Sequence, residues 1–138
     1  MPALTATPIA GLTITARRTF TVKDVRAYEA VTAGRNAGRL RETATYGKPV
    51  VPPLLVGSLF SSLIANELPI RGATVIGQML KFLRPVYVGE TVSATIEIVS
   101  VREDHQLLQL VTQAATGRGL CVDGEAVVSY GPVPPSAA

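Results

Sequence analysis

The feature that most constrains the fold is a change of hydrophobic period near the middle of the chain. Between Pro53 and Gly72 the apolar residues recur at helical spacing. After Gly72 apolar and polar residues alternate, which is typical of strands with one buried face. Four such strands are predicted, at 74–84, 91–102, 106–115 and 120–130. One helix followed by four strands indicates an α+β fold with an antiparallel sheet packed on that helix.

The predicted helix carries few polar side chains. Pro53 suits its first turn, because a residue in that position needs no N–H. A wide apolar stripe runs along it, made of Leu54, Leu55, Leu59, Phe60, Leu63 and Ile64. The remaining positions are mostly small, at Gly57, Ser58, Ser61 and Ser62. A helix that is apolar or small nearly all round is expected to be buried, and Pro69 and Gly72 are expected to end it.

The first third of the chain predicts a strand, a short helix and a loop. Residues 12–20 alternate as a strand does. Thr21 and Asp24 then stand three positions apart, as in a capping box that starts a helix. This helix is expected to end near Ala33–Gly34. Residues 34–51 are polar and rich in glycine, and a loop of this length is usually functional or a lid.

Composition limits the class of protein. With 138 residues, 47% of them hydrophobic, the chain is expected to fold as a single domain over 1–138 with loose ends at about 1–10 and 131–138. A net charge of +3 without a dense basic run excludes a nucleic-acid footprint. The longest apolar segment is too short to span a membrane. The single cysteine favours an intracellular, cytoplasmic protein, and the absence of a Cys/His cluster argues against a metal site. The sequence has no phosphate-binding motif, so no cofactor is expected.

Two stretches resemble one branch of a known fold family. Residues 49–60, Pro-Val-Val-Pro-Pro-Leu-Leu-Val-Gly-Ser-Leu-Phe, are similar to the start of the central helix in the MaoC-like (R)-specific enoyl-thioester hydratases and 3-hydroxyacyl-thioester dehydratases. Residues 77–91, from Gly77 to Thr91, resemble the first long strand and turn of these enzymes, and 101–104 and 124–128 also fit. The resemblance covers roughly residues 18–130.

The resemblance implies a hot-dog fold, in which an antiparallel sheet wraps around a central apolar helix. It also implies a ligand and a partner. Hot-dog proteins typically dimerise with their sheets side by side and their pockets at or near the interface. The expected ligand is an acyl thioester of CoA or of an acyl carrier protein. The expected partner is a second copy of the chain or a homologous hot-dog chain.

The catalytic positions that the resemblance assigns are altered. The family's loop motif Asp-x-Asn-Pro-x-His supplies the two groups that hold water and shuttle protons. Asn36 fixes the register, so Gly34 stands for the Asp and Arg39 for the His. Glycine carries no acid or base, and arginine stays protonated in proteins. The family's chemistry therefore lacks its proton carriers in this chain.

A third element of the family's site is altered as well. Family members polarise the thioester carbonyl with a backbone N–H at the start of the central helix. Pro53 stands at that position and has no N–H. Losing one such donor typically costs about two to three orders of magnitude in rate. The Leu54 N–H is a substitute only after a shift in register.

Several residues remain as candidates for binding or for different chemistry. Arg35, Arg39 and Arg41 suit a phosphate or carboxylate clamp, with a solvated loop face as the plainer alternative. Tyr46 is either a hydrogen-bond donor or acid, or a packing residue, and Asn36 either takes part in chemistry or caps the loop.

Three further positions are predicted to contact the substrate: Leu54 and Ser58 on the central helix, and Gln78 on the strand after it. A serine nucleophile needs a base, and the sole histidine, His105, is predicted in a distant turn. The helix serines are therefore expected to allow close packing.

Three functions follow from this reading. The first is a non-catalytic or tunnel-shaping subunit that pairs with a homologous chain carrying Asp and His. The second is an enzyme of diverged chemistry, such as cyclisation, isomerisation or hydrolysis, that uses Arg39, Tyr46 and Asn36. The third is a binding module that sequesters an acyl thioester.

Overall fold

The computed structural model describes residues 8–32, 48–70 and 72–130. Within these ranges five strands form one antiparallel sheet in the order β1-β3-β4-β5-β2, and two helices accompany it. The strands are β1 (Thr13–Thr19), β2 (Thr74–Phe82), β3 (Thr91–Arg102), β4 (Leu107–Thr116) and β5 (Gly119–Ser129), and the helices are α1 (Val22–Thr32) and α2 (Pro53–Asn66).

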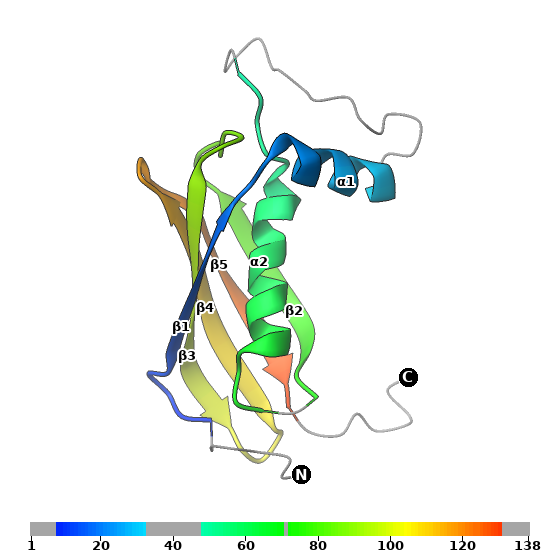
Figure 1. Ribbon diagram of the computed structural model, residues 1–138. Coiled ribbons are helices and arrows are strands. Elements are labelled where there is room, and N and C mark those ends of the chain that lie inside the picture. Colours follow the sequence, from blue (N-terminus) through cyan, green and yellow to red (C-terminus); the bar gives the residue numbers. More distant parts are fainter. Residues whose placement is uncertain (1–7, 33–47, 71, 131–138) are drawn as a thin grey trace.

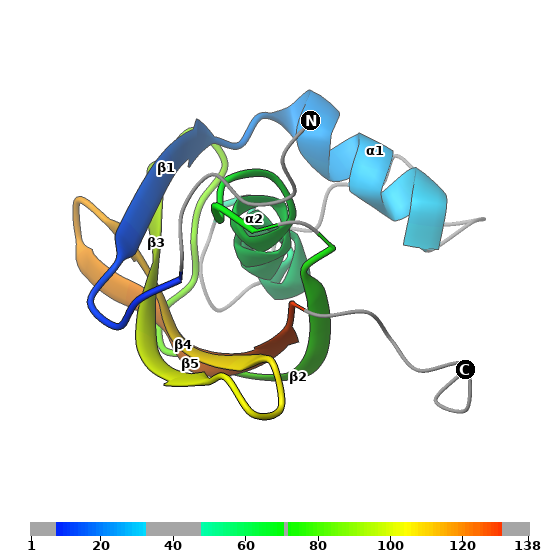
Figure 2. The same cartoon turned by 90° about the horizontal axis from the view of Figure 1, so that it is seen from below.

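The sheet curls around α2. Seen along the helix axis, β1 and β3 lie on one side of α2 and β2 on the other, so that the helix occupies the concave face (Figure 2). α1 lies outside this arrangement, at the end of the molecule where α2 begins (Figure 1). The architecture confirms the predicted α+β fold with an antiparallel sheet wrapped around one helix.

The core lies between the concave face of the sheet and α2. Alternate residues of β3 and β4 are fully buried, among them Ile96 and Leu110. From the helix, Phe60, Leu63 and Ile64 face them with at most 2% of their surface exposed. Burying side chains of this size stabilises the fold by about 1.5–3 kcal/mol each. The strand alternation of the sequence is therefore the pattern that builds the core.

Two glycines bring α2 and β2 into close contact with the rest of the structure. A Cβ on Gly57 would lie 2.8 Å from Leu80 Cδ1, so this position in α2 lets the helix approach β2. On β5, a Cβ on Gly124 would overlap the carbonyl oxygen of Met79. Only glycine fits between these two strands as they are placed.

The prediction that α2 is buried on nearly all sides is wrong for the single chain. Leu54 is 60% exposed, and Ser58, Ser61 and Ser62 are also exposed. The physical reason is that the sheet covers one side of the helix only. Among the described residues, nothing covers the other side.

The ends of the elements fall close to the predicted positions. α2 begins at Pro53 as predicted but ends at Asn66, three residues before Pro69, with Glu67 as its C-cap. The strands begin and end within two residues of the predicted bounds. α1 begins as the capping box predicts, because Thr21 N–H donates to Asp24 Oδ2 at 2.9 Å and Asp24 N–H to Thr21 Oγ1 at 3.2 Å.

Candidate functional site

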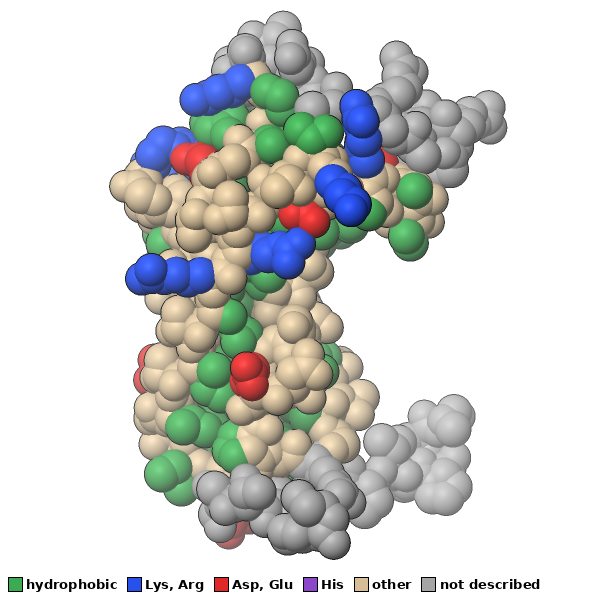
Figure 3. All heavy atoms as spheres, viewed as in Figure 1, with side chains coloured by type: hydrophobic (Ala, Val, Ile, Leu, Met, Phe, Trp, Pro, Cys, Tyr) green, Lys and Arg blue, Asp and Glu red, His purple; other side chains and the backbone are tan. Residues whose placement is uncertain are grey.

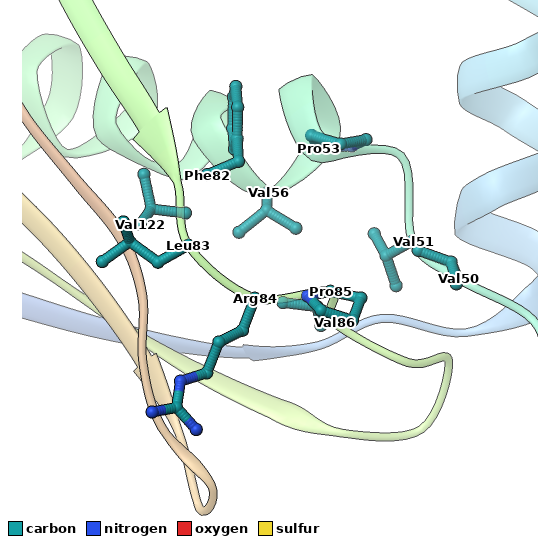
Figure 4. Close-up of a pocket in the computed structure, with 10 residues that line it drawn as sticks. All are labelled: Val50, Val51, Pro53, Val56, Phe82, Leu83, Arg84, Pro85, Val86 and Val122. Atoms are coloured by element: carbon teal, nitrogen blue, oxygen red, sulfur yellow. The ribbon is translucent and has the colours of Figure 1, made fainter. Parts of the chain in front are cut away.

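An apolar pocket of about 200 Å³ lies beside the first turns of α2 (Figure 4). Nearly all of its lining side chains are aliphatic or aromatic. They come from the segment before α2, from α2 itself, from the end of β2 and the segment after it, and from β5: Val50, Val51, Pro53, Val56, Phe82, Leu83, Arg84, Pro85, Val86 and Val122.

Two segments that are distant in sequence form one wall of this pocket. Val51 N–H donates to Val86 O at 2.7 Å, and Val88 N–H donates to Pro49 O at 3.1 Å. Val50 and Tyr87 form an antiparallel bridge between these bonds. The segment before α2 is thus held against the segment after β2.

Among the described residues, one amide at the N-terminus of α2 has no hydrogen-bond acceptor. Pro52 and Pro53 have no N–H, and the N–H groups of Leu55 and Val56 both donate to Pro52 O, at 3.0 and 3.3 Å. The Leu54 N–H has no acceptor among the described residues. It lies at the positive end of the helix dipole, where a carbonyl oxygen or an anion is favoured.

The one charged side chain in the pocket lining leans away from its apolar part. In Figure 4 the Arg84 side chain extends from the backbone away from Pro53 and Val56. Its Nη1 donates to Arg118 O in the β4–β5 turn at 3.0 Å. The pocket interior is therefore formed by apolar groups, and Arg84 borders it.

Arg118 fixes the segment between β2 and β3. Its Nε and Nη2 donate to the two carboxylate oxygens of Glu90 at 2.8 and 2.9 Å, and Nη2 also donates to Pro85 O at 2.6 Å. The hydrogen bond from Arg118 is the main cause that lowers the pKa of Glu90. Two cations lie over the ring of Tyr87. Arg118 Cζ is 4.8 Å from the ring centroid, and Lys48 Nζ is 4.1 Å from it.

The sequence prediction missed this cluster. Glu90 and Arg118 are 28 residues apart, and each stands in a turn where a charged residue is unremarkable. No spacing in the sequence marks them as partners.

Most of the predicted catalytic and anion-binding positions lie outside the described residues. These are Gly34, Arg35, Asn36, Arg39, Arg41 and Tyr46. Pro53 is described, and it is the first residue of α2 and lines the pocket. The structure thus has a proline at the helix start, where the family resemblance expects an amide donor.

Leu54, Ser58 and Gln78 do not line this pocket in the single chain. Leu54 and Ser58 lie on the exposed side of α2, and Ser58 Oγ donates to Leu55 O at 2.6 Å. Gln78 is exposed on β2 and pairs with Ala126, a residue of the concave face. Their contact with a substrate remains a prediction.

The pocket residues Phe82 and Val122 are ones that the sequence reading missed. Both positions read as ordinary strand residues, although Phe82 stands in the stretch that carries the family resemblance.

His105 lies in the β3–β4 turn, at the opposite end of the sheet from the pocket (Figure 1). Its Nε2 is 3.3 Å from Asp104 Oδ2. In the described part of the chain no three His, Cys, Asp or Glu side chains are grouped as metal ligands, and neither helix is long and apolar enough to cross a membrane.

β2 forms an edge of the sheet that exposes apolar side chains. It pairs with β5 on one side only. Ile76 is 58% exposed, Met79 47% and Phe82 42%, and Leu83 directly after the strand is 50% exposed. Phe82 and Leu83 also line the pocket, whereas Met79 pairs with the exposed Glu125 on the outer face of the sheet.

Comparison with curated proteins finds enoyl-CoA hydratases and 3-hydroxyacyl-thioester dehydratases. No family model matches the chain. It is 42% identical over 87 residues to the (R)-specific enoyl-CoA hydratase of Aeromonas caviae, a match that covers 62% of this chain and 65%, just under two thirds, of that relative. It is 34% identical over 116 residues to the mitochondrial 3-hydroxyacyl-[acyl-carrier-protein] dehydratase FERN of Solanum lycopersicum, covering 79% of this chain and 69% of that relative.

The fold agrees with these relatives. The solved structure of the (R)-hydratase from A. caviae involved in PHA biosynthesis superimposes with a TM-score of 0.81 at 35% identity. The superposition covers 90% of this chain and 98% of that one.

Proposed function

Because the chain belongs to the hot-dog family of (R)-specific enoyl-CoA hydratases and 3-hydroxyacyl-thioester dehydratases, we propose that it binds an acyl thioester as the non-catalytic, tunnel-shaping subunit of such an enzyme. The observation that carries the proposal is a contrast within the candidate site. An apolar pocket lies at the start of α2, while the family resemblance assigns Gly34, Arg39 and Pro53 to the positions of the three groups of the family's chemistry.

The pocket supports binding of the acyl end of the ligand. Its lining is apolar apart from Arg84, as an acyl chain requires. Its volume of about 200 Å³ is below the range of about 300–1,000 Å³ that is usual for pockets enclosing a whole drug-sized ligand. A pocket of this volume is expected to hold the acyl group alone, with its carrier outside.

The same region does not support hydration by this chain alone. Water addition to an unsaturated thioester needs a base and an acid within hydrogen-bond reach of the reacting atoms. Gly34 has no side chain to offer, and the guanidinium of Arg39 stays protonated. His105 is too distant to substitute, since it lies at the other end of the sheet.

The exposed apolar side chains of the edge strand β2 support assembly with a second hot-dog chain. An apolar edge strand is a site for pairing with another strand, and the exposed side of α2 lies next to it. A second copy would give a homodimer of silent chains. A homologous chain that keeps the Asp and His would give an active heterodimer, and the leading proposal is this heterodimer.

The test is a comparison of binding with turnover in the isolated chain. Crotonyl-CoA is titrated calorimetrically, and its hydration is followed by loss of the enoyl absorbance. We expect saturable binding with no measurable hydration. Rapid and saturable turnover by the purified chain would refute the loss of chemistry, and absence of binding would refute the ligand class.

The partner is tested separately. Purification from the native host should recover a homologous chain with an Asp-x-Asn-Pro-x-His loop, encoded next to this one. Mixing the two chains should then give hydration that neither shows alone. Recovery of a stable homodimer with no such neighbour would count against the heterodimer.

A second candidate is an enzyme of diverged chemistry on the same ligand. The Leu54 N–H favours this candidate. It has no acceptor among the described residues, so it is available to donate to a thioester carbonyl and polarise it. Arg39, Tyr46 and Asn36 are its candidate residues. Arg39→Ala should then abolish turnover with little change in melting temperature, and an unchanged rate would exclude this version. Saturable binding without any turnover or partner would leave the sequestering module.

A further inference from the structure

The basic side chains of the described residues gather at one end of the molecule. Figure 3 shows Lys and Arg over the upper half of the viewed face and almost none over the lower half. This basic end consists of the end of β1, α1, the segment before α2, the segment after β2 and the β4–β5 turn. Its cations are Arg17, Arg18, Lys23, Arg26, Lys48, Arg84 and Arg118.

Most of these cations have no carboxylate partner among the described residues. Arg18 pairs with Asp24 at 2.7 Å, and Arg118 pairs with Glu90 at 2.8 Å. The other five have no carboxylate within 4 Å in the described part of the chain: Arg17, Lys23, Arg26, Lys48 and Arg84. Arg17, Lys23 and Arg26 are exposed to solvent. Unpaired cations gathered on one surface create a positive potential that attracts an anionic partner.

The opposite end of the molecule has the reverse balance. The β3–β4 turn carries Glu103 and Asp104 beside Arg102, and Glu67 caps the far end of α2. The charge is therefore divided along the axis of α2. A partner with negative charge is drawn toward the end where α2 begins.

This end is also where the pocket lies. Arg84 belongs to both the basic end and the pocket lining. Lys48 lies two residues before the Val50–Tyr87 bridge in one wall of the pocket, and its Nζ lies over the Tyr87 ring. An acyl group held by a partner on this surface would have the pocket directly next to it.

The distribution of the cations distinguishes an extended partner from a compact one. A pyrophosphate needs several free donors that converge on one small site. Here the Arg118 guanidinium already binds Glu90 and Pro85 O, and Arg84 binds the Arg118 carbonyl. The unpaired cations Arg17 and Arg26 stand on separate elements, β1 and α1. Such a spread suits the surface of an acidic protein.

We propose that the basic end of this chain docks an acidic acyl carrier protein, which delivers its acyl group to the pocket at the start of α2. The inference rests on the proposed function for its ligand class, an acyl thioester. It adds the choice of carrier, a protein surface in place of the CoA nucleotide, and the residues that recognise it.

The test measures docking without the acyl group. The probe is a purified acyl carrier protein of negative net charge in its apo form, which lacks the prosthetic arm, and its binding is followed by fluorescence anisotropy. The variants are Arg17→Glu and Arg26→Glu, singly and together. Arg102→Glu, at the opposite end, is the matched control with the same change of net charge. Crotonyl-CoA binding to each variant is measured in parallel.

We expect the apo carrier to bind the wild type, and each variant at the basic end to weaken binding about threefold to tenfold, with the pair weaker still. Arg102→Glu should have little effect. Raising the salt concentration from about 50 mM to about 300 mM should weaken the wild-type complex, which gives a result independent of how the variants fold. Crotonyl-CoA binding should be the same in all variants.

Four outcomes would overturn the inference: no binding of the apo carrier, equal weakening by Arg102→Glu, equal weakening of crotonyl-CoA binding by the variants at the basic end, or binding of a short DNA duplex as tight as that of the carrier. Failure of the docking surface leaves crotonyl-CoA binding to the wild type intact. Failure of the proposed ligand class abolishes crotonyl-CoA binding whatever the carrier does, so the two are distinguishable.

Discussion

The two edges of the sheet differ in what they offer to a partner. β1 shows Thr13, Thr15 and Arg17 on its outer face, and its Thr15 and Thr19 side chains hydrogen-bond to threonines of β3. β2 exposes Ile76 and Met79 instead. Charged and polar edges resist strand pairing, whereas apolar edges favour it. We therefore expect the β1 edge to face solvent and the β2 edge to be covered by a second chain.

The largest effect is expected where β2 joins the sheet. Gly124→Ala would place a Cβ against the Met79 carbonyl, and backbone cannot yield as a side chain tip can. We expect a loss of about 3 kcal/mol or more in the free energy of unfolding, measured in denaturant. Gly117→Ala, in a turn with open space around it, is the matched control and should change stability by less than about 0.5 kcal/mol. Similar values for the two variants would contradict the close approach of β2.

The second test compares the edges directly. Ile76→Lys combined with Met79→Lys places two charges where we expect a second chain to pack. Burying these charges should weaken the dimer that we propose by about a hundredfold or more, as measured by light scattering over a concentration series. The pair Thr13→Lys and Thr15→Lys on β1 is the control and should leave the mass unchanged. Dissociation by the β1 pair alone would reverse the assignment of the two edges.

A smaller effect is expected in the segment that leads from the β2 edge to the inner strand β3. Glu90→Gln removes the charge that binds Arg118, and we expect it to lower stability by about 1–2 kcal/mol at neutral pH. The pKa of Glu90 is lowered in the folded state, so its contribution is complete above the ordinary value of 4.5 and is lost as the pH falls through the lowered value. The stability difference between wild type and Glu90→Gln should therefore shrink below about pH 4.5, as measured by thermal unfolding. A difference that stays constant down to pH 3 would show that the charge of Glu90 is not what stabilises this segment.

The smallest effect is expected at the end of β1. Thr21→Ala removes the side chain that caps α1, and stability should fall by about 1 kcal/mol, as measured by calorimetry. Thr32→Ala in the last turn of the same helix is the control, because its hydroxyl bonds back to Tyr28 O and contributes little. Equal losses in both variants would argue against the cap.

Local patterns predicted the elements because each element is set by its own residues. The alternation in β3 places Val92, Ala94 and Ile96 in the core as expected. Pro53 starts α2, and Thr21 with Asp24 starts α1, through contacts within four residues. The apolar stripe of α2 also predicted a buried helix, but it could not show that part of the helix face is uncovered in one chain.

The geometry of the candidate site was less predictable because it depends on distant partners. The wall of the pocket needs Val51 to meet Val86, and the charge cluster needs Glu90, before β3, to meet Arg118 in the β4–β5 turn. No periodicity encodes such pairs. The family resemblance did place Pro53 at the start of the central helix, next to the pocket. The assignment of Gly34 and Arg39 to the family's Asp and His positions remains a prediction from the sequence.

The double proline before α2 has a spectroscopic consequence. Pro52 and Pro53 carry no amide proton, and those of Leu55 and Val56 are hydrogen-bonded, so the Leu54 amide is the one at the helix tip that has no acceptor among the described residues. In a ¹⁵N-correlated spectrum the signal of the Leu54 amide should move when an oxygen atom of a bound molecule reaches the tip. The chain thus carries its own reporter for occupancy at the start of α2, beside the pocket.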